Sequence, residues 1–128
     1  MNAPANTDIV SAVAEAQARF AADNPLSQAQ LDKAAAFMPG GNTRTVLFYP
    51  PFPLTMTKGE GCHLWDLDGH RYIDFLGEYT AGLYGHSNAM IRAAIDRALD
   101  NGIVMGGQNQ AEADLAAAIV NRFPGIER

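Results

Sequence analysis

One arginine in this sequence stands where it could bind an acidic group. Arg44 lies in the loop that follows Pro39-Gly40-Gly41. A guanidinium group presents a planar fork of N–H donors that matches the two oxygens of a carboxylate. The residue type therefore makes Arg44 a candidate carboxylate-binding residue. An arginine in a glycine-flanked loop is also commonly no more than a solvated surface charge, and the local sequence leaves both interpretations open.

Three apolar or aromatic residues follow Arg44 closely: Val46, Phe48 and Tyr49. Ligand pockets are mostly apolar with few polar anchors, so these side chains could form a wall for the rest of an acidic substrate. They could equally pack beneath the loop. Tyr79 is ambiguous in the same way, since a tyrosine can also be a core residue with a satisfied hydroxyl group.

The other residues that could do chemistry form weaker patterns. The three histidines have no recognised metal-ligand spacing, which favours turn or core positions for them. The run Asp66-Leu67-Asp68-Gly69-His70 could suggest a cation site, but a turn at its glycine explains the pattern more simply. Cys62 is the only cysteine, so an intrachain disulfide and a cysteine metal cluster are excluded.

Size and composition indicate one globular domain. The 128 residues are 48% hydrophobic and 18% charged, with a net charge of −5. The acidic balance argues against a nucleic-acid partner, which would require clustered lysine and arginine. We expect no membrane partner, because no apolar run approaches the ~20 residues of a bilayer span. Residues 1–8 do not resemble a secretory signal, and a cytoplasmic location is expected.

Two helices are expected to precede the Arg44 loop. Apolar residues at helical spacing predict a helix over Thr7–Ala22, ended by Asn24-Pro25. A second helix is expected to begin at Ser27, which has capping-box spacing with Gln30, and to stop at Pro39-Gly40-Gly41. Residues 39–53 hold four prolines and two glycines and are expected to form an extended loop, not a packed element.

Three short strands and two further helices are expected after the loop. The strands are predicted at Leu54–Lys58, Cys62–Asp66 and Arg71–Phe75, with turns at Gly59-Glu60-Gly61 and Asp68-Gly69. One helix is predicted over Asn88–Asn101, capped by Ser87 and stopped by Gly102, and another over Ala111–Arg122. The order predicts an α+β fold: two helices, a three-stranded antiparallel meander, then two helices.

Three stretches of the sequence, taken in order, resemble a known family. They are Met38-Pro39-Gly40-Gly41-Asn42-Thr43-Arg44, Gly59-Glu60-Gly61, and Leu64-Trp65-Asp66-Leu67-Asp68-Gly69-His70-Arg71-Tyr72-Ile73-Asp74. They are similar to the N-terminal part of class III aminotransferases and glutamate-1-semialdehyde aminomutases, which are fold-type I enzymes that use pyridoxal phosphate (PLP). The resemblance covers about residues 27–128. Val46–Tyr49 and Glu78–Gly82 resemble, more narrowly, β-amino-acid aminotransferases of the β-phenylalanine type.

The resemblance implies a function and roles for particular residues. It implies PLP-dependent transamination of a β-amino acid with a 2-oxo acid as acceptor, in a homodimer with shared active sites. Arg44 matches the arginine that contacts the substrate carboxylate in the family. Tyr79 lies in the segment that passes close to cofactor and substrate, and Val46 belongs to the expected apolar wall. These three residues are the predicted substrate-binding residues, and no catalytic or cofactor-binding residue is assigned.

PLP chemistry needs a lysine whose pKa is lowered by burial or by neighbouring charge. Lys33 and Lys58 are the only lysines, and both are expected to be solvated. Residues 1–128 are therefore expected to be the N-terminal helices, loop and small-domain meander that lead into a large PLP-binding domain, inactive alone and unable to bind PLP covalently. A truncated, non-catalytic partner-binding protein and an aminomutase of the same superfamily remain as alternatives.

Overall fold

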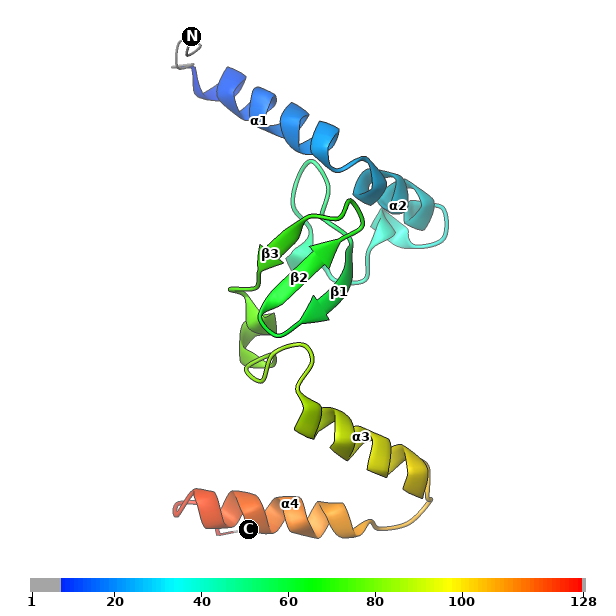
Figure 1. Ribbon diagram of the computed structural model, residues 1–128, viewed down its shortest axis with the longest axis vertical. Helices are drawn as coiled ribbons and strands as arrows, with labels where there is room; N and C mark the ends of the chain where they lie inside the picture. The colour runs from blue at the N-terminus through cyan, green and yellow to red at the C-terminus, as the bar shows by residue number, and fades with distance from the viewer. Residues whose placement is uncertain (1–7, 128) are drawn as a thin grey trace. The chain divides into compact units, whose positions relative to one another are not determined.

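The computed structural model describes residues 8–127 and confirms the α+β architecture. The elements follow one another as two α-helices, a three-stranded antiparallel sheet, and two more α-helices (Figure 1). The strands lie in the order β1 (Met56–Glu60), β2 (His63–Asp66) and β3 (Arg71–Ile73). The chain divides after Asn88 into two compact units, each of which is described by itself. Among the described residues, no helix is long and apolar enough to cross a membrane.

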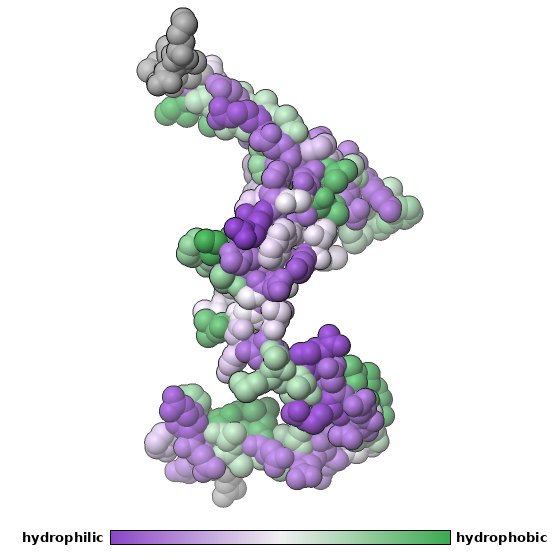
Figure 2. Space-filling model, in the orientation of Figure 1, coloured by the Kyte–Doolittle hydropathy of each residue, from purple (hydrophilic) through white to green (hydrophobic). Residues whose placement is uncertain are grey.

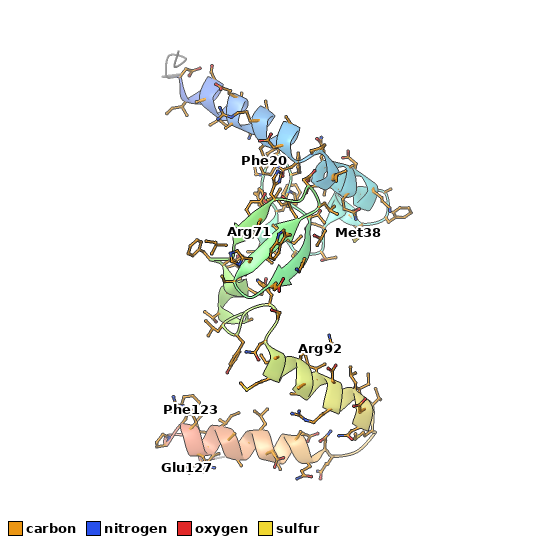
Figure 3. The ribbon with its side chains drawn as sticks, in the orientation of Figure 1. Phe20, Met38, Arg71, Arg92, Phe123 and Glu127 are labelled. Atoms are coloured by element: carbon orange, nitrogen blue, oxygen red, sulfur yellow. The ribbon has the colours of Figure 1, made fainter. Side chains whose placement is uncertain are left out.

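Helix α1 spans Ile9–Asp23 and begins at a side-chain cap. The carboxylate of Asp8 accepts hydrogen bonds from the backbone N–H groups of Val10 and Ser11. Thr7, the predicted first residue, lies outside the described residues. Ile9 and Val10 are exposed, whereas Phe20, near the end of the helix (labelled in Figure 3), has its ring centroid 5.1 Å from that of Phe52. Only the last turn of the apolar face is therefore packed within this unit.

Helix α2 spans Pro25–Ala35, and the predicted capping box at its start is wrong. The helix begins two residues earlier than expected because Pro25 occupies its first turn, where a missing N–H costs nothing. Ser27 lies inside the helix and is fully buried. Its hydroxyl donates to Asp68 at 3.1 Å and accepts from the backbone N–H of Thr55 at 3.2 Å. Ser27 thus ties the helix to the sheet region instead of capping it.

A distant carboxylate satisfies the exposed N–H groups at the start of α2. Asp68, in the turn between β2 and β3, accepts from the N–H of Leu26 at 2.8 Å and from the N–H of Ser27 at 3.1 Å. The first N–H groups of a helix have no partner within it, and a negative charge there is favourable. Asp68 therefore fastens the helix to the meander.

The sheet consists of β1 (Met56–Glu60), β2 (His63–Asp66) and β3 (Arg71–Ile73). Strand β1 lies two residues further along the chain than predicted, because Gly59 is a strand residue and not part of the turn. A Cβ atom at Gly59 would lie 2.6 Å from Cγ of His86, so the glycine permits the histidine ring to approach the strand. Strand β3 ends at Ile73, two residues earlier than predicted.

The buried part of this unit is small and partly polar. Among the described residues, Phe52 is the one hydrophobic side chain that is buried. Because Phe52 belongs to the loop over residues 39–53, that loop packs against the rest of the unit, contrary to expectation. That loop also contains two 3₁₀ turns, Pro39–Gly41 and Thr45–Leu47. The buried carboxylate of Asp66 accepts from the Tyr72 hydroxyl at 2.7 Å and from the His70 backbone N–H at 2.8 Å. Burial would raise the pKa of Asp66, but these hydrogen bonds and the His70 ring outweigh it and lower that pKa.

The second unit contains α3 (Ala89–Asn101) and α4 (Gln110–Arg122). Helix α3 begins at Ala89, one residue later than predicted. The Ser87 hydroxyl accepts from the N–H of Gly61 at 3.0 Å. Gly102 has φ +94° and ends α3 as predicted.

Large apolar side chains are exposed in both units, as the surface in Figure 2 shows. They include Leu83 and Val104, which are 81% and 90% exposed.

Candidate carboxylate-binding site

A cavity of about 620 Å³ lies in the first unit. Apolar side chains from α2, the loop and the strands make up most of its wall, among them Leu31, Leu47, Phe48, Tyr49, Leu54 and Leu64. Its lining residues with basic, acidic or imidazole side chains are Arg44, Asp74, Glu78 and His86. An apolar space with a few polar groups on its wall is typical of a small-molecule site.

Arg44 reaches the cavity because the loop before it is fixed locally. The Asn42 side chain accepts from the Arg44 N–H at 3.1 Å and donates to the Gly40 carbonyl at 3.0 Å. Gly41 is buried with φ +67°, and a Cβ atom there would lie 2.6 Å from Cδ1 of Leu31. Only glycine meets both conditions, because it tolerates the left-handed region and has no side chain to clash. The Pro39-Gly40-Gly41-Asn42 sequence therefore positions the arginine.

The Arg44 guanidinium forms an ion pair with Glu78. The hydrogen bond to Glu78 and the attraction between the two charges raise the pKa of Arg44. The side chains are 51% and 43% exposed. Arg44 is therefore a permanent cation at the cavity wall that is accessible to ligands.

The segment that carries Glu78 is anchored at both ends by Asp74 and His86. The Asp74 carboxylate accepts from the backbone N–H groups of Leu76 and Gly77 at 3.0 and 2.9 Å. Its other oxygen lies 2.9 Å from Nε2 of His86. The hydrogen bond from Gly77 is the main reason that the pKa of Asp74 is lowered, and His86 adds to the effect. These contacts fix the position from which Glu78 meets Arg44.

The predicted apolar wall is only partly assembled. Phe48 and Tyr49 line the cavity, and the Tyr49 hydroxyl accepts from the N–H of Leu54 at 2.9 Å. Val46 and Tyr79 are 66% and 57% exposed and are not among the lining residues. Their roles as substrate-binding residues stay predictions.

Neither lysine lines the cavity. Lys58 pairs with Glu60 at 2.5 Å, and its Nζ atom lies 4.8 Å from the ring centroid of Trp65. Lys33 lies on an exposed position of α2. Within residues 8–127 there is also no group of three or more histidine, cysteine, aspartate or glutamate side chains that could hold a metal ion.

Sequence reasoning did not assign Asp74, Glu78 and His86 to the site. Nothing local signals these residues, because the contacts join segments 12 to 34 positions apart. One indirect signal existed at Gly59, since a glycine within a strand often marks the close approach of another group. That group is the His86 ring.

The chain is similar to known aminotransferases along most of its length. Residues 48–128 match the family model described as Aminotransferase class-III. The chain is 54% identical over 120 residues to the beta-phenylalanine transaminase of Variovorax paradoxus, and 46% identical over 123 residues to an uncharacterized aminotransferase of Schizosaccharomyces pombe. These alignments cover 94% and 95% of this chain but only 28% of either relative.

Solved structures agree with these similarities. The crystal structure of the Variovorax paradoxus beta-phenylalanine aminotransferase matches with a TM-score of 0.92, over 94% of this chain and 28% of that one. An omega-transaminase from Sphaerobacter thermophilus, 31% identical, matches with a TM-score of 0.77 over 80% of this chain and 23% of its own. The family model covers more than half of the sequence, and the chain therefore belongs to the class III aminotransferases.

Proposed function

We propose that this chain provides the carboxylate-binding part of the active site of an aminotransferase, which transfers the amino group of a β-amino acid to a 2-oxo acid. The observation that carries the proposal is the position of Arg44, a permanent cation on the wall of a largely apolar cavity. The similarity to a beta-phenylalanine transaminase supports the choice of substrate.

In this proposal the residues of the cavity bind and orient the substrate. Arg44 holds the acid group through paired N–H donors, which fixes the direction of the carbon chain. Phe48 and Tyr49 receive an aromatic or aliphatic side chain. Val46 and Tyr79 complete this wall after a movement of their loops, or through contact with further residues of the assembled enzyme.

Class III aminotransferases use PLP, which supplies the electron sink and carries the amino group between substrates. The described residues do not fit this cofactor as a complete site. The two lysines lie outside the cavity, and among the described lining residues Arg44 is the single arginine or lysine, already paired with Glu78. We infer that the lysine and the phosphate-binding groups come from other residues, in the remainder of a longer polypeptide or in a second chain. A homodimer and a cytoplasmic location belong to the same proposal.

Two alternatives have specific support. A glutamate-1-semialdehyde 2,1-aminomutase from Symbiobacterium thermophilum is 41% identical over 59% of this chain, which keeps an aminomutase as a candidate. The many exposed apolar side chains suit a non-catalytic protein that binds a partner. Transaminase activity toward β-phenylalanine, with no isomerisation of glutamate 1-semialdehyde, would separate the first proposal from both.

The test is kinetic and uses the full-length natural polypeptide that contains residues 1–128. We expect Arg44→Ala to lower kcat/KM for β-phenylalanine about 10- to 100-fold, because a charge-assisted pair contributes about 1.5–3 kcal/mol. Arg44→Lys should retain part of the activity. The matched control is Arg71→Ala, which alters an exposed arginine on β3 that does not line the cavity (Figure 3). Equal kcat/KM values for wild type and Arg44→Ala would contradict the proposal.

A further inference from the structure

The Arg44 guanidinium is already engaged by a carboxylate of the same chain. Its Nη2 atom donates to Oε1 of Glu78, 34 positions later in the sequence. Both side chains line the cavity, and Arg44 is the only arginine or lysine among the lining residues that the structure describes. An acidic ligand that enters this cavity therefore meets a cation that has an acidic partner.

Glu78 is presented to Arg44 by a defined loop conformation. Three consecutive residues, Glu78, Tyr79 and Thr80, have φ values of 48°, 53° and 84°. The left-handed region is uncommon for residues other than glycine, and three in succession require support from their surroundings. Backbone hydrogen bonds from Tyr79 N–H to the Leu76 carbonyl (3.0 Å) and from Gly82 N–H to the Gly77 carbonyl (2.8 Å) close this turn, and Asp74 holds the segment at Gly77. The fold therefore holds the backbone of Glu78 beside the cavity, within reach of Arg44.

The geometry of a guanidinium makes the two carboxylates alternatives. Its strongest contact with a carboxylate uses two adjacent N–H groups in one plane. Glu78 takes a donor of Nη2, the nitrogen that belongs to both such pairs, and its negative charge repels a second acid at the same guanidinium. Both side chains of the pair remain about half exposed, and such pairs are weakly held because water screens the charges. Exchange of one carboxylate for the other is therefore feasible. The larger the fraction of molecules in which Arg44 is bound to Glu78, the weaker is the apparent affinity for an acidic ligand.

We propose that Glu78 is a specificity-determining residue, an internal carboxylate that competes with the substrate acid group for Arg44; the inference rests on the carboxylate-binding role proposed above. The pair stays closed when the cavity is empty or holds a neutral ligand. It opens only for an acid that binds Arg44 better than Glu78 does. The charge of Arg44 is thereby compensated in both states, and neutral analogues gain nothing from it.

The test measures the affinity of 3-phenylpropanoate, an aromatic carboxylate without an amine, by calorimetry on the full-length natural polypeptide. We expect Glu78→Gln to lower its Kd about two- to fivefold, the range expected from loss of an exposed ion pair. The gain should vanish when Arg44→Ala is also present. Glu60→Gln is the matched control, because Glu60 forms a similarly exposed pair with Lys58 away from the cavity. Glu78→Asn repeats the test with a residue that tolerates the left-handed backbone.

The possible outcomes separate the two proposals. If Arg44→Ala weakens binding but both Glu78 variants bind as wild type does or more weakly, competition is overturned and the role of Arg44 stands. A gain from Glu78→Gln that persists with Arg44→Ala would show a general effect of charge and would also overturn competition. If wild type and Arg44→Ala bind equally, or if no variant binds, the role of Arg44 fails and the inference fails with it.

Discussion

The contact between Asp68 and the start of α2 makes a large effect on stability predictable. In Asp68→Ala, the N–H groups of Leu26 and Ser27 lose their acceptor, and the buried Ser27 hydroxyl loses one of its two partners. Loss of a helix cap typically costs about 1 kcal/mol, and loss of a hydrogen bond to a charged group about 1.5–3 kcal/mol. We therefore expect the free energy of unfolding to fall by about 2–4 kcal/mol. Asp68→Asn, which keeps one acceptor oxygen, should cost about half as much.

Two measurements check this prediction. Urea unfolding gives the loss of free energy, and hydrogen exchange reports locally on the amides of Leu26 and Ser27, which should exchange at least about 30-fold faster for a loss of 2 kcal/mol. Asp32→Ala, at an exposed position of the same helix, is the control and should change stability by less than about 0.5 kcal/mol. If Asp68→Ala left both the free energy and the two exchange rates unchanged, the carboxylate would not be fastening α2 to the meander.

Two other positions give independent tests. Because the pKa of Asp66 is lowered in the folded chain, the stability it contributes is present above its unfolded pKa of about 3.9 and is lost as pH falls through the folded value. Asp66→Asn should therefore reduce stability at pH 7 and flatten its loss below pH 4 in acid titrations followed by circular dichroism; an unchanged acid profile would contradict this. Gly85 has φ +76°, and a Cβ atom there would lie 2.7 Å from the Gly61 carbonyl oxygen. Gly85→Ala should cost about 1–3 kcal/mol in urea unfolding, whereas Gly107→Ala, with no atom within 4 Å of its Cβ, should be nearly neutral; equal effects would refute the steric argument.

Features with a local cause were predicted from the sequence. The end of α3 at Gly102 follows from glycine's access to the left-handed region, and the antiparallel meander follows from its turn residues. The turn before Arg44 also has a local cause, since the Asn42 side chain bonds to the Gly40 carbonyl and to the Arg44 N–H, but the sequence predicted only an extended, unpacked loop there. The proposed carboxylate-binding role of Arg44, however, came from the family resemblance and not from this turn.

Features that depend on distant contacts were missed or misread. Ser27 matched a capping box by spacing, but its hydroxyl binds Asp68, 41 positions away, and no local pattern signals such a partner. Gly59 looked like a turn residue and instead makes room for His86. The left-handed run at Glu78, Tyr79 and Thr80 has no propensity signal at all, since none of these residue types favours it. The Arg44–Glu78 pair could therefore be found only in three dimensions.

The central claim is that Arg44 binds the acid group of the substrate. A crystal structure of the full-length natural polypeptide with 3-phenylpropanoate tests it most directly. We expect the ligand carboxylate at about 2.7–2.9 Å from the Arg44 guanidinium nitrogens, the aromatic ring against Phe48 and Tyr49, and the Glu78 carboxylate displaced. A ligand whose carboxylate binds elsewhere, with Arg44 still paired to Glu78, would contradict the account.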